Sequence, residues 1–117
     1  MKTILLTITL LFVGTLTYGQ NKNAKASVEV DGVCMMCKKR IEKASFKTKG
    51  VKSAVWNVDT HELKLFFDEN KTSVAQIEAN LAAAGHDTKS FVASDKAYEA
   101  LHPCCKYREA AVIEDHK

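Results

Sequence analysis

The segment DGVCMMCKKRI, at residues 31–41, places two cysteines three positions apart. Before it, apolar and polar residues alternate over residues 24–30, and this period of two predicts a strand. After it, apolar residues return at helical spacing from Cys37 onward, which predicts a helix. The segment therefore predicts a loop between a strand and a helix, with Cys34 in the loop and Cys37 near the first helical turn.

This position has consequences for the chemistry of both cysteines. Unpaired backbone N–H groups and the positive end of the helix dipole surround sulfurs at the start of a helix. We expect this field to lower the pKa of both thiols. Thiolates are soft ligands, and a two-sulfur site on a loop suits Cu(I) or another soft ion. Met35 and Met36, between the cysteines, are unusual and are candidates for exposed thioethers.

Further landmarks follow the cysteines at ordered spacings: Ile41-Glu42, Ala44, Gly50-Val51, Leu65-Phe66-Phe67-Asp68 and Ala84-Gly85-His86. With the cysteines, they resemble the heavy-metal-associated domain of copper chaperones, of copper-ATPase N-terminal modules and of the periplasmic mercury-binding protein. The resemblance covers about residues 24–92. It implies an α+β, ferredoxin-like β-α-β-β-α-β fold with Cys34 and Cys37 as metal ligands. The chain departs from the pattern at Gly32, where the family usually has a methionine that packs under the loop.

Periodicity and capping residues predict the remaining elements of this fold. They are strands at residues 51–58 and 63–67 that form a hairpin, a helix opened by the capping box at residues 73–76, and a fourth strand at residues 87–93. Trp56, in the first strand of the hairpin, is expected to pack in the core. Gly85 is well placed to end the helix.

His86 follows Gly85 directly. In the family fold, the loop after this helix lies at the same end of the molecule as the C-x-x-C loop. The resemblance therefore implies that His86 is a third, weak metal ligand or an electrostatic modulator. A surface histidine with a local hydrogen bond is the other interpretation that stays open.

The resemblance ends at residue 93, and a second cysteine pair lies beyond it. A short helix capped by Ser94 is expected next, and Cys104 and Cys105 follow it. Adjacent cysteines seldom bridge each other without strain. Three roles stay open for this pair: a site shared with the C-x-x-C cysteines, which we favour, a separate metal site, or a disulfide or idle pair.

Residues 1–19 resemble a secretory signal peptide, with one positive charge, a short apolar run and a Gly19-Gln20 junction. The apolar run is shorter than the roughly 20 residues that span a membrane. Tyr18 is not the small residue typical of a cleavage site, so an uncleaved anchor is the alternative. We expect cleavage to leave residues 20–93 as the metal-binding domain and residues 94–117 as a C-terminal helix and Cys-Cys tail.

The charge of the chain gives no reason to expect nucleic-acid binding. The formal net charge is +3, and it is +2 without the leader, in which Lys2 is the only charged residue. Nothing in the sequence assembles a nucleophile with a base, so we expect no catalytic activity. The mature protein is expected to be periplasmic or secreted.

These features predict an exported protein that captures, carries or sequesters a soft ion. Cu(I) is favoured, with Zn²⁺, Hg²⁺ or another soft metal as alternatives. The expected partners are a metal-transporting ATPase, an efflux component or another metal-binding domain.

Two other functions stay open. C-x-x-C at a helix start also occurs in thiol-disulfide oxidoreductases, although the one proline here, Pro103, lies beside the second cysteine pair. Zn²⁺ held by all four cysteines is the structural alternative.

Overall fold

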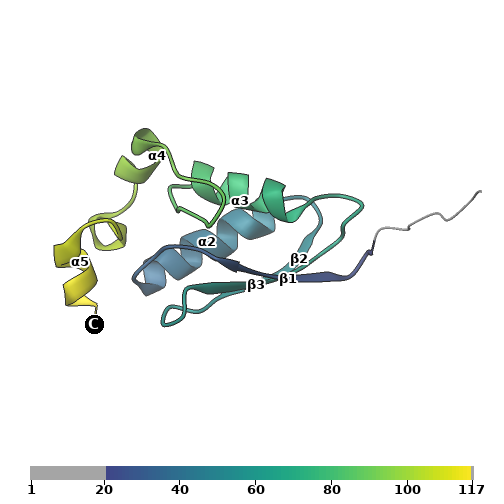
Figure 1. Ribbon diagram of the computed structural model, residues 1–117, viewed down its shortest axis with the longest axis horizontal. Coiled ribbons are helices and arrows are strands. Elements are labelled where there is room, and N and C mark those ends of the chain that lie inside the picture. Colours follow the sequence, from purple (N-terminus) through teal and green to yellow (C-terminus); the bar gives the residue numbers. More distant parts are fainter. Residues whose placement is uncertain (1–20, 117) are drawn as a thin grey trace, which may run out of the picture.

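The computed structural model describes residues 21–116, and residues 1–20 and 117 are not described. The predicted leader and its cleavage point therefore lie outside the described residues. A sheet carries two helices on one face, and a C-terminal segment of short helices lies beyond one end (Figure 1). No helix within residues 21–116 is long and apolar enough to cross a membrane.

The sheet has three antiparallel strands in the order β1-β3-β2. They are β1 (Ala24–Glu29), β2 (Val51–Trp56) and β3 (Glu62–Phe67). Trp56 pairs with Leu63 across the hairpin, and both side chains are fully buried. Val55, between Ala54 and Trp56, is 53% exposed, so the predicted alternation of the two faces is confirmed.

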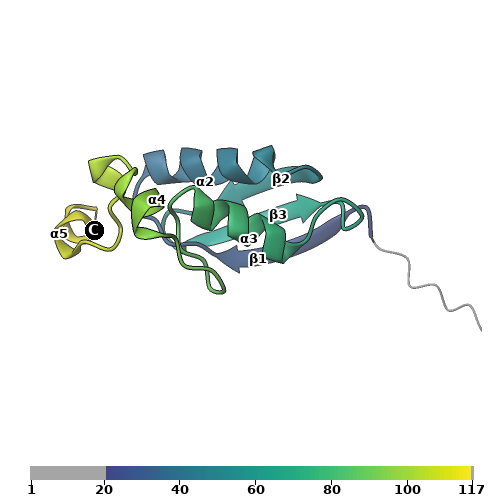
Figure 2. The ribbon, with the colours of Figure 1, turned by 90° about the horizontal axis from the view of Figure 1, so that it is seen from above.

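The two long helices, α2 (Met35–Lys47) and α3 (Val74–Ala83), lie side by side over the sheet (Figure 2). The side chain of Ser73 accepts the N–H of Gln76 at 3.2 Å, which confirms the predicted start of α3. The predicted end is confirmed too, because Gly85 has a φ of +104°. Its N–H and that of His86 satisfy the last carbonyls of the helix.

The predicted fourth strand at residues 87–93 is wrong. A single antiparallel bridge between Val30 and Thr88 stands in its place. The N–H of Thr88 donates to the carbonyl of Phe91 at 2.8 Å, and the N–H of Phe91 donates to Thr88 Oγ1 at 3.1 Å. These local bonds close a turn and use backbone groups that a strand would have paired with β1.

The C-terminal segment consists of three short helices. They are α4 (Asp95–Glu99), the 3₁₀ helix η2 (Pro103–Cys105) and α5 (Ala110–Asp115). Ser94 caps α4 as predicted, accepting the N–H of Ala97 at 3.1 Å. Tyr98, Leu101, Cys105 and Tyr107 belong to the same buried cluster as the side chains between helices and sheet. The tail thus packs against the end of the domain where α2 begins (Figures 1 and 2).

Candidate metal site

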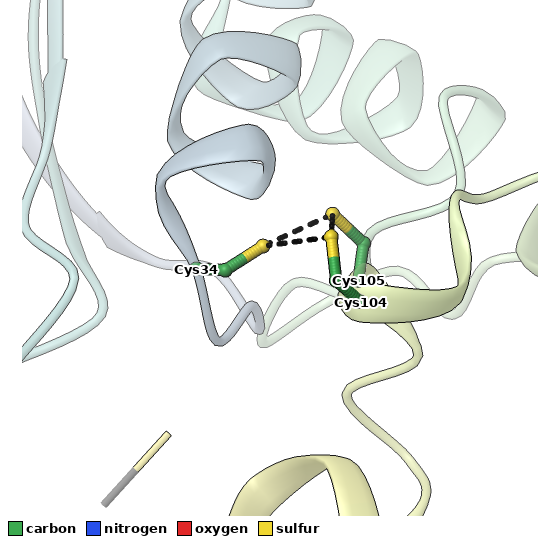
Figure 3. A group of neighbouring side chains, drawn as sticks. All are labelled: Cys34, Cys104 and Cys105. Carbon is green, nitrogen blue, oxygen red and sulfur yellow. Dashed lines mark hydrogen bonds between the residues drawn. The ribbon is translucent and has the colours of Figure 1, made fainter. Parts of the chain in front are cut away.

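All four cysteines of the chain are free thiols, and the structure brings their sulfurs together. Cys34 is the N-cap residue of α2, and Cys37 lies in its first turn. Cys34 Sγ lies 3.3 Å from the sulfur of Cys37, 3.7 Å from that of Cys104 and 3.2 Å from that of Cys105. The sulfurs of Cys104 and Cys105 are 3.9 Å apart (Figure 3). Three arrangements were open for the tail pair, and the structure has the one in which the tail sulfurs lie beside Cys34.

Three of the four sulfurs have the mutual spacing of a metal-binding group, and Cys37 lies outside that group. The Sγ atoms of Cys34, Cys104 and Cys105 all lie within 4.8 Å of one another. In a tetrahedral site with metal–sulfur bonds of about 2.3 Å, the sulfurs would be about 3.8 Å apart. Cys37 and Cys105 are almost completely buried, and Cys104 is the most exposed of the four. The cluster therefore has a closed inner side and an open side at Cys104.

The four thiols differ in their readiness to ionise. Burial opposes the thiolate of Cys34, but the backbone N–H of Cys37 and the thiols of Cys105, Cys37 and Cys104 together lower its pKa to about 7. Burial raises the pKa of Cys37, and burial with the neighbouring sulfurs raises those of Cys104 and Cys105. The prediction of a lowered pKa is confirmed for Cys34 and wrong for Cys37. The metal-free cluster favours one thiolate that receives hydrogen bonds from other thiols.

Trp56 forms the floor under the C-x-x-C loop. A Cβ atom on Gly32 would lie 3.0 Å from two carbons of the indole ring, so the ring occupies the space beside this glycine. Trp56 Nε1–H donates to the carbonyl of Val30 at 3.0 Å, which fixes the ring beneath the loop. The predicted core role of Trp56 is confirmed. The aromatic ring fills space beneath the loop, where the resemblance places a methionine in other members.

The basic run after Cys37 is partly used inside the fold. Lys38 Nζ lies 2.6 Å from Glu42 Oε2 and donates to the carbonyl of Trp56 at 2.8 Å. Glu42 Oε2 also accepts the backbone N–H of Trp56 at 2.9 Å. Lys38 thus ties α2 to the end of β2. Lys39 and Arg40 line a groove between α2 and α3 that reaches Met36.

His86 is fully buried and lies outside the sulfur group. Its Nδ1 is 2.8 Å from the carbonyl oxygen of Asp31, and because a carbonyl only accepts, Nδ1 carries the proton. Its ring stacks on Tyr107 with centroids 5.4 Å apart. Burial lowers the pKa of His86, which keeps the imidazole neutral. The surface interpretation is wrong, and the geometry favours a brace between the loop and the tail over a ligand.

Tyr107 and Arg108 hold the tail in place, and neither was singled out by the sequence. The Tyr107 hydroxyl donates to the carbonyl of Gly85 at 2.7 Å and accepts the N–H of Asp87 at 2.8 Å. Arg108 binds both carboxylate oxygens of Asp87, at 2.7 and 3.1 Å, and lies 4.3 Å over the ring of Tyr98. These contacts have no periodicity. The one available signal was an aromatic-basic pair directly after the second cysteine pair.

The chain is similar to metal-binding proteins over the part before the tail. Residues 27–87, just over half of the chain, match the sequence model of the heavy-metal-associated domain. The copper chaperone CopZ of Staphylococcus haemolyticus is 33% identical over 63 residues, which are 53% of this chain and 93% of that protein. The match to the family ends before Cys104 and Cys105.

Solved structures of the same kind confirm the expected ferredoxin-like α+β fold. The N-terminal domain of a potential copper-translocating P-type ATPase from Bacillus subtilis, in the Cu(I)-loaded state, has a TM-score of 0.55 at 26% identity. The similarity covers 57% of this chain and 85% of that one. Oxidised MerP from Ralstonia metallidurans has a TM-score of 0.50 at 28% identity, over 56% of this chain and 96% of that one.

Proposed function

This chain belongs to the heavy-metal-associated domain family, with a heavy-metal-binding, chaperone-like domain, and we propose that it captures, carries or sequesters a soft ion. Cu(I) is the first candidate, because a copper chaperone and a Cu(I)-loaded domain are among its relatives. Hg²⁺ is an alternative supported by the similarity to MerP. The ligands we propose are the thiols of Cys34, Cys37, Cys104 and Cys105.

One observation carries this proposal: the two tail thiols lie 3.7 and 3.2 Å from the sulfur of Cys34. A C-x-x-C loop alone offers two sulfurs and leaves a bound Cu(I) open on one side. Here η2 adds two more sulfurs to the open side of the loop (Figure 3). Soft thiolates in this number suit Cu(I) and related ions.

The protonation of the cluster suggests an order of events when an ion arrives. Cys34 has the lowest pKa of the four thiols, so it is the thiol that is most readily available as a thiolate when an ion arrives. The remaining thiols lose their protons as they bind, so binding releases protons and tightens as pH rises. No oxidation or reduction is needed, because the ion moves from one set of sulfurs to another. This is binding and ligand exchange, and we infer no catalytic role.

A Cu(I) competition titration tests the ligand assignment. Replacing Cys34 by serine removes the sulfur at the centre of the cluster, and we expect the Cu(I) affinity to fall by roughly two orders of magnitude, about 2.7 kcal/mol. Far-UV circular dichroism should show an unchanged fold, because Cys34 is the N-cap residue of α2 and serine is a preferred residue at that position. A Cys34→Ser/Cys37→Ser double variant that holds one Cu(I) with unchanged affinity would contradict the proposal.

Zn²⁺ held by all four cysteines is the second candidate, because structural zinc sites in proteins are built from four such ligands. Native mass spectrometry of the mature chain, purified without reductant, separates the alternatives by reporting bound metal and thiol count together. Bound copper with four reduced thiols supports a carrier or a store. Bound zinc supports a structural site. A metal-free chain with two thiols fewer would favour the thiol-disulfide oxidoreductase.

We propose export of the mature chain to the periplasm or outside the cell. The support is the signal-like composition of residues 1–19. Cell fractionation and N-terminal sequencing should find a chain that begins near Gln20 outside the cytoplasm. Recovery of the intact leader in the inner membrane would contradict a freely diffusing carrier.

The partner we propose is a metal-transporting ATPase, an efflux component or another metal-binding domain. Its support is the structural similarity to an ATPase domain described as Cu(I)-loaded. Lys39 and Arg40, beside the cluster, would suit an acidic docking face on such a partner. We propose no nucleic-acid partner, given the nearly balanced charge.

A further inference from the structure

A fifth sulfur adjoins the open side of the four-thiol cluster. The thiol of Cys104 lies 3.3 Å from Met36 Sδ and donates to it. Met36 is the second residue of α2 and lies between the two cysteines of the C-x-x-C segment. Met35 precedes it, and within residues 21–116 no hydrogen bond joins Met35 to a cysteine. Because neighbouring helical residues point about 100° apart, only one of the two methionines faces Cys104.

Burial does not explain the position of Met36. Its side chain is 45% exposed, whereas a methionine held by packing would be covered. Cys104, its partner, is the most exposed of the four thiols. The pair therefore forms the solvent-facing edge of the cluster, while Cys37 and Cys105 lie on the closed inner side. An ion that approaches from solvent reaches this edge first.

The thioether differs from the four thiols in charge and in metal preference. It is neutral at every pH and has no proton to lose, so it is a ligand before any thiol has ionised. Soft thioethers bind Cu(I), whereas the ligands that hold Zn²⁺ in proteins are thiolates, imidazoles and carboxylates. A thioether at the edge of the cluster therefore favours Cu(I) over Zn²⁺.

We propose that Met36 is a Cu(I) ligand, which with Cys104 receives the ion at the solvent-facing edge and selects it over Zn²⁺. This inference rests on the proposed function, because it concerns the same cluster. The step is a ligand exchange without a change of oxidation state. Bonds from Cu(I) to Met36 Sδ and Cys104 Sγ form as its bond to the donor's thiolate breaks, and the Cys104 proton passes to that departing thiolate.

Leucine is the variant that isolates the sulfur, because it keeps nearly the same volume without a donor atom. In the mature chain, Met36→Leu should lower the Cu(I) affinity about tenfold in a competition titration and change the Zn²⁺ affinity less than twofold. Met35→Leu is the matched control, since Met35 is exposed on the same helical turn. It should leave both affinities unchanged.

A second measurement follows the thioether directly. In protein labelled with ¹³C at the methionine methyl groups, Cu(I) should shift the Met36 signal and leave that of Met35 in place, and Zn²⁺ should shift neither. The two leucine variants assign the signals. Equal Cu(I) affinity in both variants, or an unmoved Met36 methyl, would overturn the inference and leave the four-thiol site standing. An unmodified chain that binds no Cu(I) would instead overturn the proposed function and this inference with it.

Discussion

At the scale of single residues, Gly32 and Trp56 together determine the packing beneath the C-x-x-C loop. The indole ring is fully buried, and its N–H is bonded to Val30. A Cβ on Gly32 would lie 3.0 Å from that ring and 3.0 Å from the Cβ of Cys37. In a close-packed core, moving the indole ring or the Cβ of Cys37 would cost free energy. The glycine is therefore a consequence of the large aromatic ring beside it.

The variant Gly32→Met, which restores the residue usual in the family, should destabilise this chain. We expect overpacking against Trp56 to lower the free energy of unfolding by about 1–3 kcal/mol. Urea unfolding of the reduced, metal-free protein measures the change. The control is the same substitution in a Trp56→Leu background, where the smaller side chain should make the added methionine less harmful. Equal costs in both backgrounds would show that Trp56 is not the obstacle.

His86 should make the stability of the metal-free fold depend on pH. Burial lowers the pKa of His86 in the folded chain below 6.5, its value in the unfolded chain. At a pH between the folded and the unfolded pKa, the unfolded chain therefore binds a proton that the folded chain does not. The free energy of unfolding should therefore fall as the pH drops below about 6.5. Urea unfolding at pH 7.5 and 5.5 measures how much free energy of unfolding is lost on acidification. This loss should be smaller in His86→Gln than in the exposed control His102→Gln. Equal losses would contradict this assignment.

At the scale of elements, the helices and the hairpin could be predicted because periodicity and capping residues determine them locally. Residues 87–93 could not, because Thr88 and Asp87 bond to backbone groups nearby and end the strand pattern. For η2, the sequence favoured a position beside the C-x-x-C loop as one of three arrangements but did not determine it. That position depends on Tyr107 and Arg108 reaching the loop after α3, and such contacts leave no periodic trace.

Tyr107→Phe tests whether these contacts position the tail thiols. The variant leaves the carbonyl of Gly85 and the N–H of Asp87 without the hydroxyl, which should cost about 1–3 kcal/mol of unfolding free energy. The Cu(I) affinity should fall several-fold as η2 loosens. In a Cys104→Ser/Cys105→Ser background, the same substitution should leave the affinity unchanged. An affinity that falls equally in both backgrounds would mean that Tyr107 acts on the C-x-x-C loop instead.

At the scale of the whole molecule, the tail changes what a two-thiol domain can do. C-x-x-C and its surroundings were enough to predict the family and one half of the candidate site. The other half comes from a segment outside the family match, which is held in place by the contact between Arg108 and Asp87. More sulfurs around an ion mean that an acceptor must displace more ligands before the ion leaves. The tail should therefore shift the protein from delivery toward sequestration.

Replacing both tail thiols by serine tests this shift. Truncation after Ala93 would also remove Tyr98, Leu101 and Tyr107 from the core, so Cys104→Ser/Cys105→Ser is the cleaner change. The Cu(I) affinity should fall tenfold or more, about 1.4 kcal/mol, because two ligands are lost. Transfer to a two-thiol acceptor domain, followed by stopped flow, should become faster for the same reason. For Cys104→Ser alone, the Cu(I) affinity and the transfer rate should lie between those of the double variant and those of the unmodified chain. If affinity and transfer rate match those of the unmodified protein, the tail thiols do not bind the ion. The contacts of Tyr107 and Arg108 would then position η2 only as part of the fold.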